Sequence, residues 1–228
     1  MLENFFNPST IAVVGVSAES NKLGSVVFNN IISAKYGGKL YAVNPKSAGQ
    51  QLYGRDCIVS VRDAKEELDL VVVVVPAKFA MAVIDDCIFN KTKNVVIITA
   101  GFGEIGEHDL ENEIARKCRE SGINLLGPNC FGYISTFHNV NATFADGTPA
   151  RGNTAFISQS GAFCAAMLDW ARDKDIGFSH FISIGNKAHL SETELLEALK
   201  DDKNTKAFLF YLESIRDGQK FLRIAKEV

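Results

Sequence analysis

The chain has 228 residues, of which 46% are hydrophobic and 22% charged, values that are ordinary for a globular protein with a substantial core. A formal net charge of −3 gives no basic surface of the kind that nucleic-acid binding requires, so no nucleic-acid partner is expected. No apolar run approaches the roughly 18 residues of a membrane-spanning helix, so no membrane partner is expected either. The five cysteines form no Cys-x-x-Cys pair and the first residues lack a secretory pattern, which favours reduced thiols and a cytoplasmic location.

Short apolar runs alternate with amphipathic stretches in the first half of the chain. Runs of Val and Ile without period-two alternation indicate strands covered on both faces, which is typical of a parallel sheet. Alternating strands and helices then predict a doubly wound α/β sheet with right-handed crossovers. The expected strands are 10–14, 40–44, 68–75, 94–99 and 123–126. The expected helices are 24–34, 77–90 and 107–121.

From Cys130 to Gly152 the sequence is rich in Asn, Thr, Gly and Pro and has no long apolar period, which predicts a linker over 131–152. The alternation then restarts with strands at 154–158, 178–184 and 207–212 and helices at 162–172 and 192–199. We therefore expect two α/β domains, at 1–130 and 153–228. A second domain of about 75 residues is small for a doubly wound unit, so we expect it to be incomplete, or truncated.

The first strand-to-helix turn runs from Gly15 to Gly24 and contains Ser17 and Lys22. A glycine turn before a helix exposes backbone N–H groups and the positive helix end, which suits phosphate. It does not match the dinucleotide fingerprint G-x-G-x-x-G, because position 17 is Ser and the next glycine comes only at 24. An ordinary strand-to-helix connection is the alternative.

The second strand ends in Asn44-Pro45-Lys46, where a typical NAD site has an acidic residue for the ribose hydroxyls. Lys46 instead favours a ligand with an extra phosphate beside the ribose. The 3′-phosphate of coenzyme A (CoA) and the 2′-phosphate of NADP both fit, and a solvated surface lysine is the alternative. The next two strands run into Val75-Pro76 and Gly101, at the edge where such sheets bind ligands. Loop flexibility explains the glycine equally well.

The second domain opens with Ser158-Gln159-Ser160-Gly161-Ala162 between a strand and a helix. Two hydroxyls, free N–H groups and the helix dipole make this turn a candidate phosphate site, and a plain N-cap by Ser160 is the alternative. A hydrolase nucleophile elbow needs glycines two residues either side of the serine, and this turn has Ser158 and Ala162 there. Glu213 follows strand 207–212, so its carboxylate is expected in the same crevice unless it is a solvated loop acid.

The same segments, taken in order, form a pattern. They are Gly15, Ser17, Lys22 and Gly24, then Asn44-Pro45-Lys46, Val75-Pro76, Ala100-Gly101-Phe102 and Gly127-Pro128-Asn129-Cys130. This order resembles NDP-forming acyl-CoA synthetases, such as the ADP-forming acetyl-CoA synthetases and the succinyl-CoA synthetase α-subunit. The resemblance covers nearly the whole chain, and its most distinctive piece is the Gly-Pro-Asn-Cys turn. It implies a Rossmann-like CoA-binding domain followed by a flavodoxin-like α/β domain.

The resemblance also implies roles for residues. CoA is expected to lie with its phosphates near Ser17, Lys22 and Lys46 and its thiol near Asn129. The residues expected to line its site are Gly15, Ser17, Lys22, Gly24, Asn44, Pro45, Lys46, Val75, Pro76, Gly101 and Asn129. Those expected at a phosphate site are Ser158, Ser160 and Gly161. Glu213 is the expected catalytic residue, since a glutamate in the family's matching Tyr-Leu-Glu segment orients a catalytic histidine.

The implied reaction is acyl-CoA + NDP + phosphate ⇌ carboxylate + NTP + CoA, through an acyl phosphate and a phosphohistidine. ADP/ATP or GDP/GTP with Mg²⁺ is expected on an ATP-grasp domain or subunit that this sequence does not contain, and an oligomer is expected. The family's phosphorylated histidine lies beyond Val228. The rival hypotheses are an NADP-dependent oxidoreductase and a non-catalytic CoA-sensing module fused to an acetyltransferase.

None of the four histidines occupies the place of the family's phosphorylated histidine. The resemblance predicts Asp in the segment Gly185-Asn186-Lys187-Ala188-His189, where this chain has His189. His189 precedes a Ser191/Glu194 capping-box pattern, so a surface position before a helix is expected for it. The other three histidines have no Cys, Asp or His at metal-ligand spacing, and no metal site is predicted.

Overall fold

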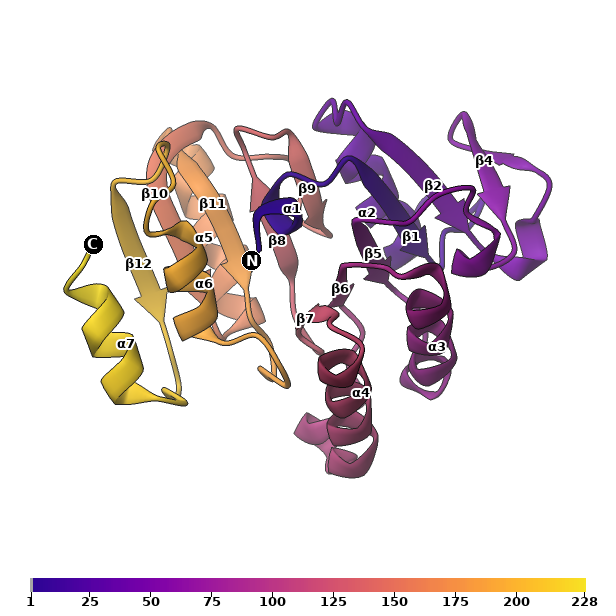
Figure 1. The fold of residues 1–228 in the computed structure, drawn as a ribbon. Helices are drawn as coiled ribbons and strands as arrows, with labels where there is room; N and C mark the ends of the chain where they lie inside the picture. Colours follow the sequence, from indigo (N-terminus) through magenta and orange to yellow (C-terminus); the bar gives the residue numbers. More distant parts are fainter. Residues whose placement is uncertain (1) are drawn as a thin grey trace.

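A computed structural model describes residues 2–228 (Figure 1). The chain forms two β-sheets, each covered by helices. The first sheet has seven strands in the order β3-β4-β2-β1-β5-β6-β7. Its strands are β1 (Thr10–Val14), β2 (Lys39–Val43), β3 (Gln51–Leu52), β4 (Arg55–Ile58), β5 (Leu70–Val73), β6 (Asn94–Ile97) and β7 (Asn124–Leu126). Its helices are α2 (Leu23–Ser33), α3 (Ala80–Asn90) and α4 (His108–Glu120). Single 3₁₀ turns are η1 (Pro45–Ser47), η2 (Val61–Asp63), η3 (Ala77–Phe79) and η4 (Gly103–Ile105).

The first sheet confirms the predicted doubly wound architecture. Every strand pair is parallel except β3–β4, and the order of the six parallel strands is the classic Rossmann 3-2-1-4-5-6 arrangement. All residues of β1, β5 and β6 are buried, as the unbroken Val and Ile runs predict. The strand order reverses between β1 and β5, so the carboxyl ends of these two strands border the crevice where this fold binds ligands.

The second sheet has five strands in the order β12-β10-β11-β8-β9. Strands β10, β11 and β12 are parallel, as predicted, and β12 forms an edge. The strands are β8 (Gly132–Ser135), β9 (Val140–Thr143), β10 (Arg151–Ser158), β11 (Phe178–Ser183) and β12 (Ala207–Tyr211). The helices are α5 (Gly161–Asp173), α6 (Glu192–Leu199) and α7 (Gly218–Ala225).

The segment 131–152 is not the plain linker that its composition predicts. It contributes β8 and β9, which pair antiparallel with each other and extend the second sheet beyond β11. The prediction is wrong because both strands are short, and because β9 buries polar side chains that bond to one another and to the loop that follows. Thr143 Oγ1 donates to Asn141 Oδ1 at 2.6 Å, and Asn141 Nδ2 donates to Thr148 Oγ1 at 2.9 Å.

The two sheets share one hydrophobic core. The short helix α1 (Glu3–Phe6), which the sequence pattern did not predict, contributes Phe5, whose ring packs 5.0 Å from that of Tyr133 on β8. The Tyr133 hydroxyl donates to the Phe5 carbonyl. From α2, Asn30 Nδ2 donates to the carbonyls of Thr143 and Ala145 at 2.9 and 2.8 Å. These contacts fix the second sheet against the first. No helix within residues 2–228 has the length and apolar character to cross a membrane.

Candidate functional site

Two cavities lie at the carboxyl ends of the strands. The Lys46 cavity, of about 470 Å³, is lined by the ends of β1, β2 and β5 and by α3, and includes Gly15, Asn44, Pro45 and Lys46. The interdomain cavity, of about 770 Å³, lies between the two sheets. It is lined by residues of the first domain, by the turn before α5 and by Glu213. Val75 and Pro76 line both cavities, so the two cavities are neighbours at the ends of β1 and β5.

The two glycines of the first turn are required by close packing. Gly15 has φ +104°, and a Cβ there would lie 2.3 Å from the Val74 carbonyl oxygen. A Cβ on Gly24 would lie 2.3 Å from the carbonyl oxygen of Gly15. Both contacts are impossible for a side chain, so glycine at each position allows the turn to fold tightly against β5 and α2.

Ser17 and Lys22 lie on this turn beside the first residues of α2. The Ser17 hydroxyl accepts a hydrogen bond from the N–H of Glu19 at 3.1 Å, and the Ser17 N–H donates to Ser25 Oγ at 3.0 Å. Lys22 is exposed and its ammonium lies 3.6 Å from the Glu19 carboxylate. Lys22 occupies the N-cap position and no side chain caps this 11-residue helix. The Ser25 N–H donates to the Lys22 carbonyl at 2.9 Å, whereas the N–H groups of Leu23 and Gly24 have no hydrogen-bond partner within residues 2–228 and can bind an anion.

At the end of β2, Asn44 and Lys46 have different surroundings. Asn44 Nδ2 donates to the Val16 carbonyl at 2.6 Å, and Asn44 Oδ1 accepts from the Lys46 N–H at 3.0 Å. These bonds tie the end of β2 to the first turn. The Lys46 ammonium has no ion-pair or hydrogen-bond partner within residues 2–228, and it borders the Lys46 cavity. Pro45 is the first residue of η1, so it fixes the backbone that presents Lys46.

Gly101 and Asn129 lie where the first domain meets the second. Gly101 has φ +108°, and its N–H donates to Glu104 Oε1. Asn129 lines the interdomain cavity, and its Nδ2 donates to Asn186 Oδ1 at 3.1 Å. The Asn186 amide in turn donates to Glu104 Oε2 at 2.6 Å. Burial raises the pKa of Glu104, but the hydrogen bonds from Gly101 and Asn186 outweigh it and the pKa is lowered overall, so the carboxylate is ionised.

The turn before α5 lines the interdomain cavity from Gln159 to Ala162. Ser160 is the N-cap of α5, with its Oγ accepting from the Phe163 N–H at 3.2 Å, so the N-cap interpretation is confirmed. A Cβ on Gly161 would meet nothing within 4 Å, which leaves open space beside the helix N-terminus. Ser158 is not brought to the cavity with the other two, because it is fully buried and its hydroxyl bonds to the Ser160 backbone.

Glu213 lines the interdomain cavity, as its place after β12 predicts. Its carboxylate is exposed and makes no hydrogen bond within residues 2–228. Its position is fixed through the backbone instead. The N–H groups of Glu213 and Ser214 both donate to Gln159 Oε1, at 3.1 and 3.3 Å. Gln159 belongs to the turn before α5, so one side chain links the candidate phosphate turn to the candidate catalytic carboxylate.

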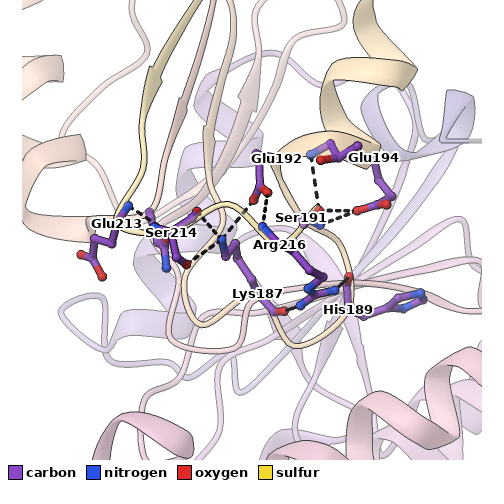
Figure 2. Close-up of polar contacts among 10 residues, drawn as sticks. Lys187, His189, Ser191, Glu192, Glu194, Glu213, Ser214 and Arg216 are labelled. Atoms are coloured by element: carbon purple, nitrogen blue, oxygen red, sulfur yellow. Dashed lines mark hydrogen bonds and ion pairs between the residues drawn. The ribbon is translucent and has the colours of Figure 1, made fainter. Parts of the chain in front are cut away.

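His189 lies outside both cavities. In Figure 2 its ring points away from Glu213. It is half-buried rather than on the open surface, and burial, followed by the positive charge of Arg119, lowers the pKa of its imidazole. The capping box that follows is confirmed: Ser191 and Glu194 bond to one another's backbone N–H groups around the start of α6.

Reasoning from the sequence missed Gln159, Asn186, Lys187 and Glu192. Lys187 and Glu192 form a buried ion pair beside Glu213, with Nζ and Oε2 3.1 Å apart (Figure 2). Gln159 lies inside the Ser158–Ala162 turn, and its position between two serines was the available signal. Within residues 2–228 no group of three or more His, Cys, Asp or Glu side chains could hold a metal ion.

Two family models match the chain. The CoA binding domain matches residues 9–136, and the succinyl-CoA ligase like flavodoxin domain matches residues 151–228. The acetate–CoA ligase [ADP-forming] I subunit alpha of Pyrococcus furiosus is 42% identical over 231 residues, covering 100% of this chain and 50% of that protein. The acetate–CoA ligase [ADP-forming] I of Archaeoglobus fulgidus is 40% identical, covering 100% of this chain and 33% of that protein.

A solved structure has the same fold. It is the dinucleotide forming acetyl-coenzyme A synthetase 1 of Ca. Korarchaeum cryptofilum in complex with phosphate and ADP. It superposes with a TM-score of 0.95 at 40% identity, over 99% of this chain and 48% of that one. The chain thus spans about a third to a half of the length of these two curated relatives. It belongs to the CoA binding domain family, within the NDP-forming acyl-CoA synthetases whose CoA-binding domain is joined to a succinyl-CoA-ligase-like flavodoxin domain.

Proposed function

We propose that this chain is the CoA-binding portion of an enzyme that interconverts acyl-CoA, NDP and phosphate with carboxylate, NTP and CoA. The observation that carries the proposal is the pair of cavities that meet at Val75 and Pro76. A long ligand with a nucleotide at one end and a thiol at the other can extend over two such neighbouring cavities. The names of the relatives, which are ADP-forming acetate–CoA ligases, support the same activity.

The residues of the first domain suit CoA. Lys46 offers an unpaired ammonium for the 3′-phosphate, and the N-terminus of α2 with Lys22 offers donors for the diphosphate. Gly15 and Gly24 keep this turn free of side chains. The thiol end then extends along Val75 and Pro76 into the interdomain cavity, next to Asn129.

The second domain suits the reacting phosphate. The N-terminus of α5 at Ser160 and Gly161 faces open space in the cavity, and N–H groups there stabilise an anion. A phosphate oxygen held at this turn attacks the thioester carbonyl, the carbon–sulfur bond breaks, and CoA leaves as a thiolate that takes up a proton. The products of this step are the acyl phosphate and CoA.

Glu213 serves the phosphoryl transfer that follows. Its carboxylate accepts a hydrogen bond from one nitrogen of an imidazole supplied from outside residues 1–228, so that the other nitrogen faces the acyl phosphate. Phosphoryl transfer to that nitrogen releases the carboxylate product. An ATP-grasp partner with ADP or GDP and Mg²⁺ then takes the phosphoryl group. We also propose that the chain and this partner form an oligomer that brings the partner to the cavity, and that the enzyme is cytoplasmic.

The test measures ATP formed from acetyl-CoA, phosphate and ADP with Mg²⁺ by the assembled enzyme, the partner included. Glu213→Gln is expected to lower the rate by roughly a hundredfold or more, on the scale of general acid–base effects, with CoA affinity unchanged. Glu113→Gln, an exposed glutamate on α4, is the matched control. An assembled enzyme that binds CoA but forms no nucleoside triphosphate would favour the CoA-sensing module instead.

A further inference from the structure

The loops that follow β11 and β12 are joined by a buried cation. Lys187 is only 5% exposed, although it lies in a loop. Its ammonium donates to Glu192 Oε2 at 3.1 Å, to the Ser214 carbonyl at 2.8 Å and to Ser214 Oγ at 3.1 Å. A lysine ammonium has three N–H groups, so all three are used. Two of these bonds go to Ser214, the residue directly after Glu213 (Figure 2).

The partner carboxylate is more deeply buried than the cation. Glu192 is 0% exposed and is the first residue of α6, where the helix dipole favours a negative charge. Its second oxygen, Oε1, accepts from the Arg216 N–H at 3.0 Å. The Arg216 guanidinium donates to the carbonyls of Lys187 and, at 2.8 Å, His189. The ion pair therefore holds the 214–216 segment at both ends.

Glu213 lies between two fixed points as a result. On one side the Gln159 side chain binds its backbone N–H, and on the other Lys187 binds Ser214. The carboxylate itself has no partner in the described chain, so its place beside the cavity depends on the backbone that these anchors hold.

The same loop also contacts the first domain. The Asn186 N–H donates to the Pro128 carbonyl at 2.9 Å, and the Ala188 N–H donates to the Gly127 carbonyl at 3.1 Å. The residues on both sides of Lys187 are thus bonded to the Gly-Pro-Asn-Cys turn that borders the interdomain cavity. Lys187 therefore connects two parts of the cavity lining, the part that contains this turn and the part that contains Glu213.

We propose that Lys187, through its buried pair with Glu192, is a positioning residue that fixes the Glu213 carboxylate over the interdomain cavity. The proposal rests on the function proposed above. Burying two charges costs more free energy than an apolar pair of the same volume, so this pair is a poor device for stability alone. It is well suited to holding a polar loop, because each of its donors and acceptors has a defined partner.

The test is a double-mutant cycle in the assembled enzyme, with Lys187→Met, Glu213→Gln and the double variant. Lys187→Met is expected to lower kcat by about tenfold to a hundredfold, the range for a small misplacement of a reacting group, with the KM for CoA within about twofold of wild type. In the Glu213→Gln background the same substitution is expected to change kcat by less than about threefold, because the group it positions is gone. A purely structural role predicts the same factor in both backgrounds, and that result would overturn the proposal.

Lys187→Met leaves the buried Glu192 carboxylate without its counter-ion, and this variant can fail to fold. The variant Lys187→Met with Glu192→Gln removes both charges, and the new amide oxygen still accepts from the Arg216 N–H. It is expected to melt near the wild-type temperature, to bind CoA with wild-type affinity by calorimetry, and to show the same fall in kcat. Faster amide hydrogen exchange confined to residues 212–217 is the readout that does not depend on activity.

The control is Lys200→Met, which removes an ion pair with Glu227 at 2.6 Å that lies outside both cavities. It is expected to leave kcat unchanged. If the neutral double variant keeps the wild-type kcat and exchange rates, Lys187 does not position Glu213. If wild type and Glu213→Gln make ATP at the same rate, the proposed roles of Glu213 and of Lys187 are both wrong. The proposed ligase function is not affected by that result. A wild-type assembly without ligase activity would overturn the proposed function itself.

Discussion

His180 on β11 makes the stability of the second sheet depend on pH. Its side chain is 1% exposed, its ring packs edge-on at 4.9 Å from Phe6, and neither ring nitrogen has a hydrogen-bond partner in the described chain. Burial lowers the pKa of the imidazole from 6.5 to about 4; the carboxylate of Asp202, 3.6 Å from Nδ1, acts in the opposite direction, and His138 lowers the pKa further. Because the effect of burial outweighs that of the Asp202 carboxylate, the ring is neutral in the folded protein at neutral pH.

The two pKa values of His180 determine whether stability rises or falls with pH. In the unfolded chain the His180 imidazole takes up a proton near pH 6.5, whereas in the folded chain it does so only near pH 4. The stability that the neutral ring contributes is therefore fully present above pH 6.5 and is lost as the pH falls toward 4. Between pH 6.5 and pH 5 the loss is about 2 kcal/mol, at about 1.36 kcal/mol per pH unit. For a chain of this size that corresponds to a fall in Tm of about 4–8 °C.

The assay is thermal unfolding followed by circular dichroism at pH 7 and pH 5. Wild type and His108→Gln, which alters an exposed histidine, are expected to lose more stability on acidification than His180→Gln. The expected difference is about 2 kcal/mol, or about 4–8 °C in Tm. His180→Leu serves as a second variant, since leucine is also neutral and suits the apolar contact with Phe6. Equal falls in Tm for wild type and both His180 variants would refute the assignment of a neutral, buried imidazole.

Three further predictions concern the turns. Lys46→Glu is expected to weaken CoA binding by roughly 1.5–3 kcal/mol, or about 10- to 150-fold, and to abolish the preference for CoA over dephospho-CoA in calorimetric titrations. Gly24→Ala is expected to cost about 1–3 kcal/mol in urea unfolding, because its Cβ would overlap the Gly15 carbonyl, whereas Gly37→Ala, with nothing within 4 Å, is the neutral control. Gly161→Asp is expected to remove the rise in Tm that inorganic phosphate gives wild type, with little change in Tm without phosphate; an unchanged phosphate effect would exclude this turn as the anion site.

The fold was predictable where burial leaves a local signal. The unbroken Val run of β5 and the matching run of β6 predict strands covered on both faces, and the alternation with helices predicts parallel pairing. The signal fails in β8 and β9, because both strands are short and the buried polar side chains of β9 bond to one another, which resembles a loop in the sequence. Helix α1 is too short to show a period, and it is held by its contacts with Tyr133.

The candidate site was predictable where it follows from the ends of parallel strands. Gly15, Lys46 and Glu213 each follow a predicted strand and Val75 ends one, so topology alone brings them to one edge of their sheet. The Lys187–Glu192 pair was not predictable, because the ammonium's other acceptors come from Ser214, 27 residues away. In the sequence, Glu192 looks like an ordinary acidic residue in the first turn of a helix.

The central claim is that CoA, rather than a nicotinamide dinucleotide, lies along the path from Lys46 past Val75 and Pro76 to the interdomain cavity. Calorimetric titration of the chain with CoA, dephospho-CoA and NADP at equal ionic strength tests it most directly. We predict one site for CoA, weaker binding of dephospho-CoA by roughly 10- to 150-fold because the Lys46 contact is lost, and still weaker binding of NADP. Tighter binding of NADP than of CoA, or equal affinities for CoA and dephospho-CoA, would contradict it.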